Sequence, residues 1–328
     1  MLTAELRDRY DVVVIGGGAA GLNGALVLAR ARRTVLVVDA GRPRNAPADG
    51  VHGLLGHDGV PPAELLTRGR DEVRRYGGQV VDGEVARASG DGDGFVVTLA
   101  DGRTVSAGRL LVTAGLVDEL PAVPGLAERW GHEVLHCPYC HGWEVRDRAI
   151  VVLGSGPMSV HQARLFRQWS ADVTYVSHTV PPDAEEAEQL VARGIRLVDG
   201  LVAAVEVRDD RLTGLRLLDG TLVGADAVVV ATRMVARAGF LDDLGLRTVE
   251  HPAGVGEHLP TDPTGSTNVP GVWAAGNVTD LSAQVGAAAA AGAAAAAQIN
   301  ADLVEAETRE AVAVHRALHA VEVGGADA

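Results

Sequence analysis

A glycine-rich turn between a buried strand and a helix constrains the fold of this chain more than any other feature. The β-branched run 11–15 leads into Gly16-Gly17-Gly18-Ala19-Ala20-Gly21, and apolar residues at helical spacing follow. In a G-x-G-x-x-G pattern Gly16 makes the tight turn, Gly18 lets the backbone approach a pyrophosphate, and Gly21 lets helix and strand pack closely. The N–H groups that begin the helix can then bind phosphate.

A second strand supports this interpretation. Residues 34–38 form another apolar run, and Asp39 at its end lies 18 residues past Gly21. An acidic side chain at this place can bind a ribose hydroxyl. The alternative is a structural turn without a ligand, but the strand, turn, helix and strand in this order favour a bound adenine dinucleotide.

The same order of elements recurs in the middle of the chain. A strand at 149–153 precedes Gly154-Ser155-Gly156-Pro157-Met158-Ser159, and a helix and the strand 172–176 follow. Ser159 replaces the third glycine and is still small enough for close packing. The second strand ends in Ser177-His178-Thr179, with neither an acid for a ribose nor an arginine for a 2′-phosphate. A second nucleotide-type fold is therefore predicted, and nicotinamide binding and its absence remain open alternatives.

The last part of the chain returns to the first fold. A strand runs into Gly276-Asn277, and an alanine-rich helix follows from Ala283. The predicted class is α/β, with two Rossmann-like, three-layer ββα dinucleotide-binding domains, the second inserted into the first. The expected boundaries are 1–117 and 248–328 for the two segments of the first domain and 118–247 for the inserted one.

The only two cysteines, Cys137 and Cys140, form one Cys-x-x-Cys motif. This spacing lets the sulfurs close a small disulfide ring and places the first thiol where a turn or helix start lowers its pKa. Half of a zinc site, a structural disulfide and two buried thiols are the alternatives. Because His136 and His141 adjoin the cysteines, they are poorly placed to complete one tetrahedron, so no metal is expected. A redox pair is the favoured interpretation.

Charge and hydropathy exclude several classes of partner. The net charge of −14 argues against nucleic acid and anionic membranes. The N-terminus lacks the apolar core of a signal peptide, and the alanine-rich run 285–297 is too weakly apolar for a membrane span. We expect a cytoplasmic protein.

Taken together, the three motifs in this order resemble the low-molecular-weight thioredoxin reductase family of FAD-dependent disulfide oxidoreductases, over roughly residues 11–300. The resemblance implies a homodimer, and a cysteine pair that exchanges electrons with the flavin. Gly276-Asn277 stands where the family has a Gly-Asp that holds the flavin ribityl chain, and Gln284 matches a glutamine near the flavin ring. The FAD-binding residues so implied are Gly16, Gly18, Ala19, Ala20, Gly21, Asp39, Ala40, Asn45, Gly276, Asn277, Gln284 and Val285.

Two departures from the reductases point to one branch of that family. The proton-donating aspartate after the second cysteine is replaced by His141, which can move protons near neutrality. The His-Arg-Arg run for NADPH is replaced by Ser177-His178-Thr179, so NADPH is an uncertain cofactor. The Cys-x-x-Cys-His-Gly motif then resembles that of the dithiol oxidases of the gliotoxin and holomycin type, in which electrons pass from a small dithiol through the cysteines and FAD to oxygen.

The predicted function is accordingly an FAD-dependent dithiol oxidase with Cys137, Cys140 and His141 as catalytic residues. The resemblance implies attack of the substrate on Cys137 and places Cys140 next to the flavin. One alternative is an NADPH-dependent reductase of a thioredoxin-like protein, and another is a flavin-binding redox sensor without turnover. The loops that carry His52, His57 and Trp143 are candidates for substrate contacts.

Overall fold

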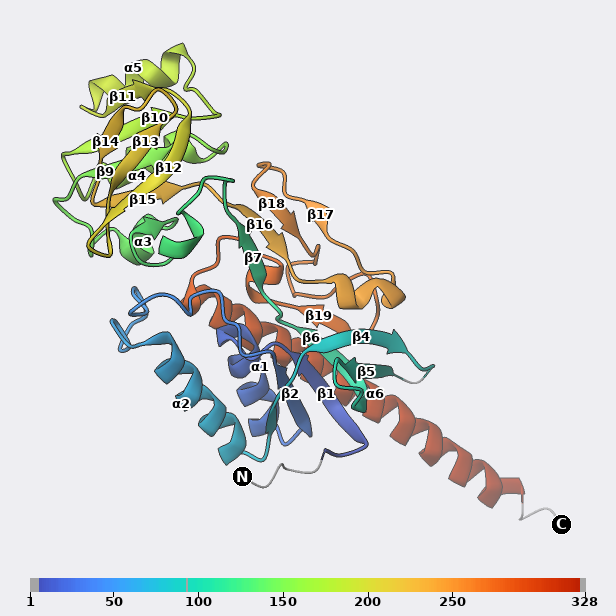
Figure 1. Ribbon diagram of the computed structural model, residues 1–328. Helices are drawn as coiled ribbons and strands as arrows, with labels where there is room; N and C mark the ends of the chain where they lie inside the picture. Colours follow the sequence, from blue (N-terminus) through green and yellow to red (C-terminus); the bar gives the residue numbers. More distant parts are fainter. Residues whose placement is uncertain (1–5, 93, 325–328) are drawn as a thin grey trace.

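The first structural unit is built on a seven-stranded sheet. Six strands have the order β3-β2-β1-β6-β5-β4, and the seventh, β19, pairs with residues 110–112 at the end of β6. The computed structural model describes residues 6–92 and 94–324 (Figure 1). The strands are β1 (Arg9–Ile15), β2 (Val35–Asp39), β3 (Gln79–Asp82), β4 (Val85–Gly90), β5 (Phe95–Leu99), β6 (Thr104–Val112) and β19 (Val272–Ala274). β1, β2, β3, β6 and β19 are parallel, whereas β4, β5 and β6 form an antiparallel meander.

Helices cover one face of this sheet, namely α1 (Ala19–Arg30), α2 (Pro62–Arg75) and α6 (Val285–Gly324). Val12 and Val14 of β1 pack in the same cluster as residues of these helices, whereas Val13 and Ile15 pack with the meander on the opposite face. A strand covered on both faces requires a continuous apolar run, which is the pattern found in the sequence. The predicted α/β class is confirmed.

The second unit contains a parallel sheet and a small antiparallel one. The parallel sheet has the order β11-β10-β9-β15-β8, and the antiparallel sheet has the order β12-β13-β14. Their strands are β8 (Val134–Leu135), β9 (Ile150–Leu153), β10 (Val173–Ser177), β11 (Arg196–Asp199), β12 (Val202–Arg208), β13 (Arg211–Leu217), β14 (Leu222–Gly224) and β15 (Ala227–Val230). The helices of this unit are α3 (Pro138–His141), α4 (Ser159–Phe166) and α5 (Ala184–Ala192), with a 3₁₀ turn, η1, at Ala127–Arg129. In Figure 1, α3 lies at the side of this unit that faces the first one.

A four-stranded sheet, β17-β18-β16-β7, lies where the chain passes between the units. β7 (Leu116–Glu119) carries the chain out and β16 (Arg233–Ala236) carries it back, and the two pair antiparallel. The other elements here are β17 (Val249–Glu250), β18 (Gly256–His258) and the 3₁₀ turns η2 (Gly239–Leu244) and η3 (Gly276–Val278). The domain limits at 117/118 and 247/248 stay a prediction, with the first of them falling inside β7.

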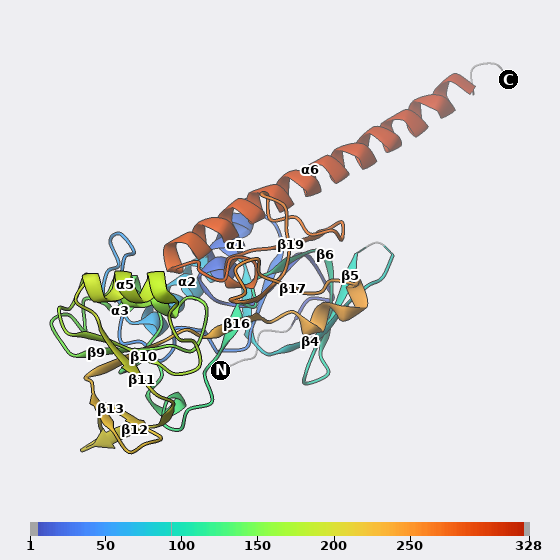
Figure 2. The same ribbon diagram turned by 90° about the horizontal axis from the view of Figure 1, so that it is seen from above.

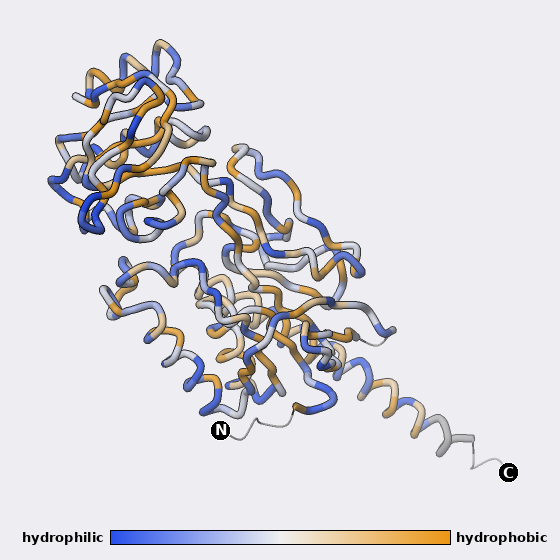
Figure 3. Tube along the Cα trace, viewed as in Figure 1, coloured by the Kyte–Doolittle hydropathy of each residue, from blue (hydrophilic) through white to orange (hydrophobic). Residues whose placement is uncertain are grey.

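The last helix extends well beyond the sheet that it covers. α6 crosses α1 so closely that a Cβ atom on Gly292 would lie 2.0 Å from the carbonyl oxygen of Ala20. Beyond Leu303 the helix leaves the body of the protein, as Figure 2 shows from above, and its surface mixes apolar and polar residues (Figure 3). Within residues 6–92 and 94–324 we find no helix that combines the length and the apolar character of a membrane span.

Candidate active site

A cavity of about 980 Å³ joins the two units. Its walls come from the loops that follow β1 and β2, from the turn before α6, and from α3 and α4 of the second unit. The predicted site residues that line it are Gly16, Gly18, Ala19, Ala20, Asp39, Ala40, Asn45, Cys137, Cys140, His141, Gly276, Asn277, Gln284 and Val285. Among the predicted catalytic and FAD-binding residues, Gly21 alone does not line it.

The first glycine turn is open toward this cavity. Gly16 has a φ of +109°, and Gly21 packs so tightly that a Cβ atom would lie 1.9 Å from the Gly16 carbonyl oxygen. At Gly18, by contrast, no atom lies within 4 Å of the position of a Cβ atom. The N–H groups of Gly17 and Gly18 donate to no acceptor within the described part of the chain. This wall therefore fits a pyrophosphate, which would accept from these N–H groups.

Asp39 lies at the end of β2 with 7% of its surface exposed. Its Oδ1 accepts a hydrogen bond from the N–H of Gly41 at 2.9 Å, and its Oδ2 accepts from Arg70 of α2 at 2.5 Å. Arg70, which no sequence motif marks, holds the carboxylate at the cavity wall. A ribose hydroxyl can donate to this carboxylate alongside those two groups.

The third wall is the turn before α6. The Nδ2 of Asn277 donates to the carbonyl oxygens of Asp280 at 3.0 Å and Ala283 at 2.9 Å. These bonds hold the turn that brings Gln284 and Val285 to the cavity. The volume, the open turn and these polar groups together fit FAD, the cofactor that the sequence predicts.

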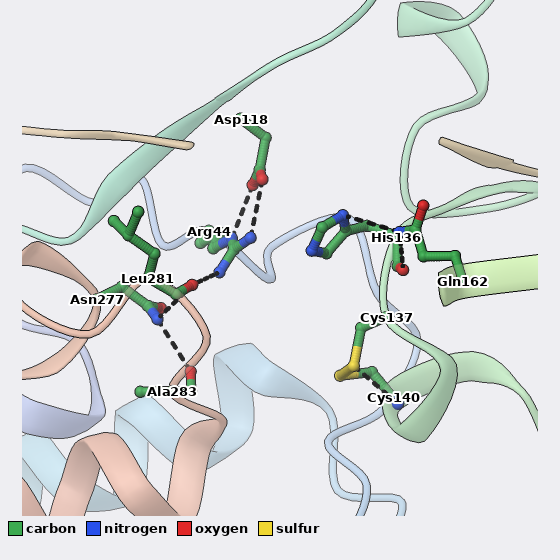
Figure 4. Close-up of a disulfide and its surroundings, with 9 residues drawn as sticks. All are labelled: Arg44, Asp118, His136, Cys137, Cys140, Gln162, Asn277, Leu281 and Ala283. Carbon is green, nitrogen blue, oxygen red and sulfur yellow. Dashed lines mark hydrogen bonds and ion pairs between the residues drawn. A yellow bond between two sulfur atoms is a disulfide. The ribbon is translucent and has the colours of Figure 1, made fainter. Parts of the chain in front are cut away.

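The cysteines form a disulfide in the opposite wall, at α3 (Figure 4). Cys137 precedes the helix, Pro138 starts it, and the N–H of Cys140 donates to the Sγ of Cys137 at 3.2 Å. A proline at the first helical position suits this geometry because its fixed φ matches the helix and it has no N–H to leave unpaired. Both cysteines are half-buried and line the cavity.

Burial lowers the pKa of His141 below its usual value. The charge of Glu144 opposes this shift, His52 adds to it, and Asp49 opposes it more weakly. His52 comes from the first unit. Its Nε2 lies 3.6 Å from Glu144 Oε1, and its Nδ1 lies 3.5 Å from Asp58 Oδ1. His141 is consequently a neutral base at pH 7, and residues of both units influence its pKa.

The three predicted substrate-loop residues differ in position. His52 lines the cavity, whereas His57 and Trp143 lie outside it. His57 is exposed, and the Trp143 ring carries the Arg146 guanidinium at 4.2 Å from its centroid. Of the three, only His52 is placed to contact a molecule inside the cavity.

An ion pair that the sequence did not predict also lines the cavity. Arg44 binds Asp118 of β7 through two hydrogen bonds of 2.7 and 2.8 Å (Figure 4). Thr232 donates to the same carboxylate at 2.8 Å. Burial alone would raise the pKa of Asp118, but Arg44 and Thr232 hold it below its usual value. The network ties a cavity loop to β7 and to Thr232, the residue before β16. Residues this far apart in sequence give no local pattern to predict it.

His136 also lines the cavity and was considered in the sequence only as a zinc ligand. Its Nδ1 lies 3.3 Å from the carbonyl oxygen of Val230, while its other ring nitrogen points toward Arg44 in Figure 4. Gln162 of α4 donates to the His136 carbonyl oxygen at 2.9 Å. Burial and the charge of Arg44 lower the pKa of His136, so this imidazole is neutral at pH 7.

The second glycine turn, unlike the first, is closed by its own side chains. The Oγ of Ser159 accepts from the N–H groups of Ser155 and Gly156, both at 3.1 Å. The N–H groups of Thr179 and Val180 donate to the Gly154 carbonyl oxygen at 2.8 and 2.9 Å. Two donors that could bind a dinucleotide phosphate are therefore already used.

His178 occupies part of the position where a cationic run would bind a 2′-phosphate. Its Nδ1 accepts a hydrogen bond from the N–H of Val202 at 2.9 Å, and burial lowers its pKa. An acceptor nitrogen carries no proton, so the ring is neutral in this contact. It contributes no positive charge for a phosphate.

The family described as pyridine nucleotide-disulphide oxidoreductase matches residues 10–297. Thioredoxin reductase tcpT of Claviceps purpurea is 33% identical over 282 residues, covering 81% of this chain and 86% of that protein. Thioredoxin reductase sirT of Leptosphaeria maculans is 30% identical, with 82% and 86% covered. The crystal structure of HlmI superposes with a TM-score of 0.87 at 45% identity, covering 93% of this chain and 95% of that one.

Proposed function

The chain belongs to the pyridine nucleotide-disulphide oxidoreductase family as a thioredoxin reductase-like oxidoreductase, and from this premise we propose that it is an FAD-dependent dithiol oxidase. It would close an intramolecular disulfide in a small dithiol, with oxygen as the final electron acceptor. The observation that carries the proposal is the contrast between the walls of the site. The Cys137–Cys140 disulfide lies in the cavity that fits FAD, while the turn that would hold a nicotinamide dinucleotide is closed by Ser159.

The first step uses His141 and Cys137. The neutral imidazole of His141 takes a proton from a substrate thiol, and the thiolate attacks the Sγ of Cys137. A bond forms between the substrate sulfur and Cys137 as the bond between Cys137 and Cys140 breaks. Cys140 leaves as a thiolate next to His141, which can return the proton.

The second step releases the product. The other substrate thiol, deprotonated in its turn, attacks the substrate sulfur of the mixed disulfide, so the product disulfide forms and Cys137 leaves as a thiolate. The N–H of Cys140, 3.2 Å from this sulfur, stabilises the negative charge. The chemistry that bound FAD supplies is a two-electron acceptor for the reduced cysteines, with oxygen taking the electrons on to hydrogen peroxide.

Flavin absorbance tests the proposal directly. The FAD-loaded protein is mixed without oxygen with a panel of small dithiols, and we expect the oxidised flavin band to bleach and to return when oxygen is admitted. Cys137→Ser and Cys140→Ser should abolish the bleaching while FAD stays bound. A panel in which no dithiol bleaches the flavin of the intact protein would refute the oxidase assignment.

The alternative is an NADPH-dependent reductase of a thioredoxin-like protein. It is favoured by the name thioredoxin reductase that both fungal relatives carry, and by the second sheet, which retains the nucleotide-type fold. Rapid bleaching by micromolar NADPH would select this function, whereas bleaching by dithiols alone selects the oxidase. A flavoprotein that responds to neither donor would be the redox sensor. The cytoplasmic location and the homodimer stay predictions.

A further inference from the structure

Tyr139 stands between the two cysteines of the redox pair and lines the same cavity. It belongs to the single turn of α3, so its backbone lies within about 6 Å of both cysteine backbones. Its side chain is nevertheless 63% exposed. An aromatic ring that is open beside a reactive disulfide can contact a molecule that approaches the sulfurs.

A second aromatic ring holds that of Tyr139 in place. Trp169, three residues past the end of α4, meets it edge to face, with 5.8 Å between the ring centroids and 85° between the ring planes. Trp169 also packs against the fully buried ring of Phe166, at 6.2 Å. Aromatic pairs prefer particular geometries, so Tyr139 offers the cavity a surface of fixed orientation.

Gly142 makes the contact with Trp169 possible. A Cβ atom at Gly142 would lie 2.7 Å from Cδ2 and 2.8 Å from Cε2 of Trp169. The φ of Gly142 is −60°, which any residue adopts, so the glycine is needed for space and not for its backbone conformation. The missing side chain lets the indole lie directly against the end of α3, where it also contacts Tyr139.

Trp143 provides the contrast. Its side chain is 64% exposed, but it does not line the cavity, and the Arg146 guanidinium lies over its ring at 4.2 Å from the centroid. Of these two exposed rings, only that of Tyr139 is placed to contact a molecule beside the sulfurs.

The first unit limits the size of the molecule that reaches this ring. His52 and Gly53 line the cavity together with Tyr139, and His52 Nε2 lies 3.6 Å from Oε1 of Glu144, which follows α3. A small molecule can occupy the cavity between them, whereas a folded domain would have to displace this contact between the units. The arrangement favours a small molecule as the partner of Tyr139.

We propose that Tyr139 selects the substrate by stacking, and that the substrate class is a small dithiol whose thiols are carried by a flat, conjugated ring. This inference rests on the dithiol oxidase function proposed above. Contact between two aromatic rings contributes more than the burial of apolar surface alone, and a saturated, puckered ring lacks this contribution. A substrate ring held against Tyr139 keeps its thiols beside the disulfide that they reduce.

Two dithiols with the same carbon skeleton test the inference. One is ortho-bis(mercaptomethyl)benzene, whose ring is flat, and the other is its ring-hydrogenated cis analogue, whose ring is puckered. Flavin bleaching of the FAD-loaded protein is followed without oxygen as each dithiol is raised in concentration. In Tyr139→Leu the half-saturation concentration should rise about three- to tenfold for the flat dithiol and less than about twofold for the puckered one. A change in the redox potential of the cysteine pair would affect both dithiols alike.

Two control variants accompany the test. Tyr139→Phe keeps the ring, and Trp143→Leu removes an equally exposed ring outside the cavity, so both should behave as the parent. Equal changes for the two dithiols in Tyr139→Leu, or the same selective change in Trp143→Leu, would overturn the inference and leave the oxidase function standing. So would a Tyr139→Leu variant that lost only its reaction with a thioredoxin-like protein. If no dithiol bleaches the parent, the oxidase function itself fails, and the inference fails with it.

Discussion

The two glycine turns occupy equivalent places in their sheets, yet their N–H groups have different partners. In the first turn, the N–H groups of Gly17 and Gly18 point to no acceptor within the described chain, and the space above Gly18 belongs to the cavity. In the second, the Ser159 hydroxyl accepts from the corresponding segment, at Ser155 and Gly156. A nucleotide fold can therefore be kept for its packing while its ligand contacts are satisfied internally.

The largest effect is expected from Gly18→Val. Gly18 has a φ of −79°, which any residue adopts, and the added side chain would enter open space, so the fold without cofactor should keep its melting temperature. The same side chain occupies the pyrophosphate position, and we expect FAD affinity to fall at least about 100-fold, near 2.7 kcal/mol. Flavin titration measures the loss. Gly156→Ala is the smaller change made at the equivalent place in the second turn, because a Cβ atom there would already lie 3.0 Å from the Cβ of Ala231. It should retain FAD, and an equal loss of FAD in both variants would remove the difference between the turns.

The next effect is expected from Asn277→Asp, which restores the residue that the resembled reductases carry. Here the Asn277 amide donates to two carbonyl oxygens at 2.9 and 3.0 Å, and a carboxylate would face them without a proton. We expect a loss of about 1–3 kcal/mol in the free energy of unfolding. Chemical denaturation measures it, with Asn277→Ala as the control that removes the donor without adding charge. A variant as stable as the parent would contradict the assigned role of this amide.

A smaller effect is expected from Ser159→Ala in the second turn. Removal of the hydroxyl leaves the N–H groups of Ser155 and Gly156 without their acceptor, at a cost of about 1 kcal/mol of stability. NADPH should still reduce the flavin poorly, because no positive charge is added near His178. Thermal unfolding and stopped-flow absorbance check both statements. Rapid NADPH reduction in this variant would show that Ser159 alone had closed the site.

The smallest effect concerns the pH dependence of the disulfide exchange. Burial lowers the pKa of His141, so its base form persists below pH 6.5, and activity should fall only as the pH drops through that lowered value. Glu144→Gln removes a charge that raises this pKa, so the acidic limb of the rate–pH profile should move to lower pH. His52→Gln should move it the other way. Rates of flavin bleaching between pH 4.5 and 8 measure the shifts, and unchanged limbs in both variants would exclude His141 as the base.

The sequence was most informative where function rests on local spacing. Gly16 and Gly18 could be identified because a strand, a turn and a helix follow one another within a short segment. Ser159 was interpreted only by its size, since a sequence does not show that a hydroxyl folds back onto the N–H groups before it. The same limit applied to Asp118, because its partner Arg44 is 74 residues away. The projection of α6 was not predicted, because an alanine-rich run shows where a helix forms but not where its neighbours end.

The pairing of β7 with β16 has a consequence for the history of the chain. Leu116 lies opposite Ala236 and Glu119 opposite Arg233, so the points of departure and return are adjacent. A short turn from Glu119 to Arg233 would close these strands into a hairpin and leave all seven strands of the first sheet in place. The second unit is thus a module that could be acquired or exchanged by recombination without breaking the framework that receives it.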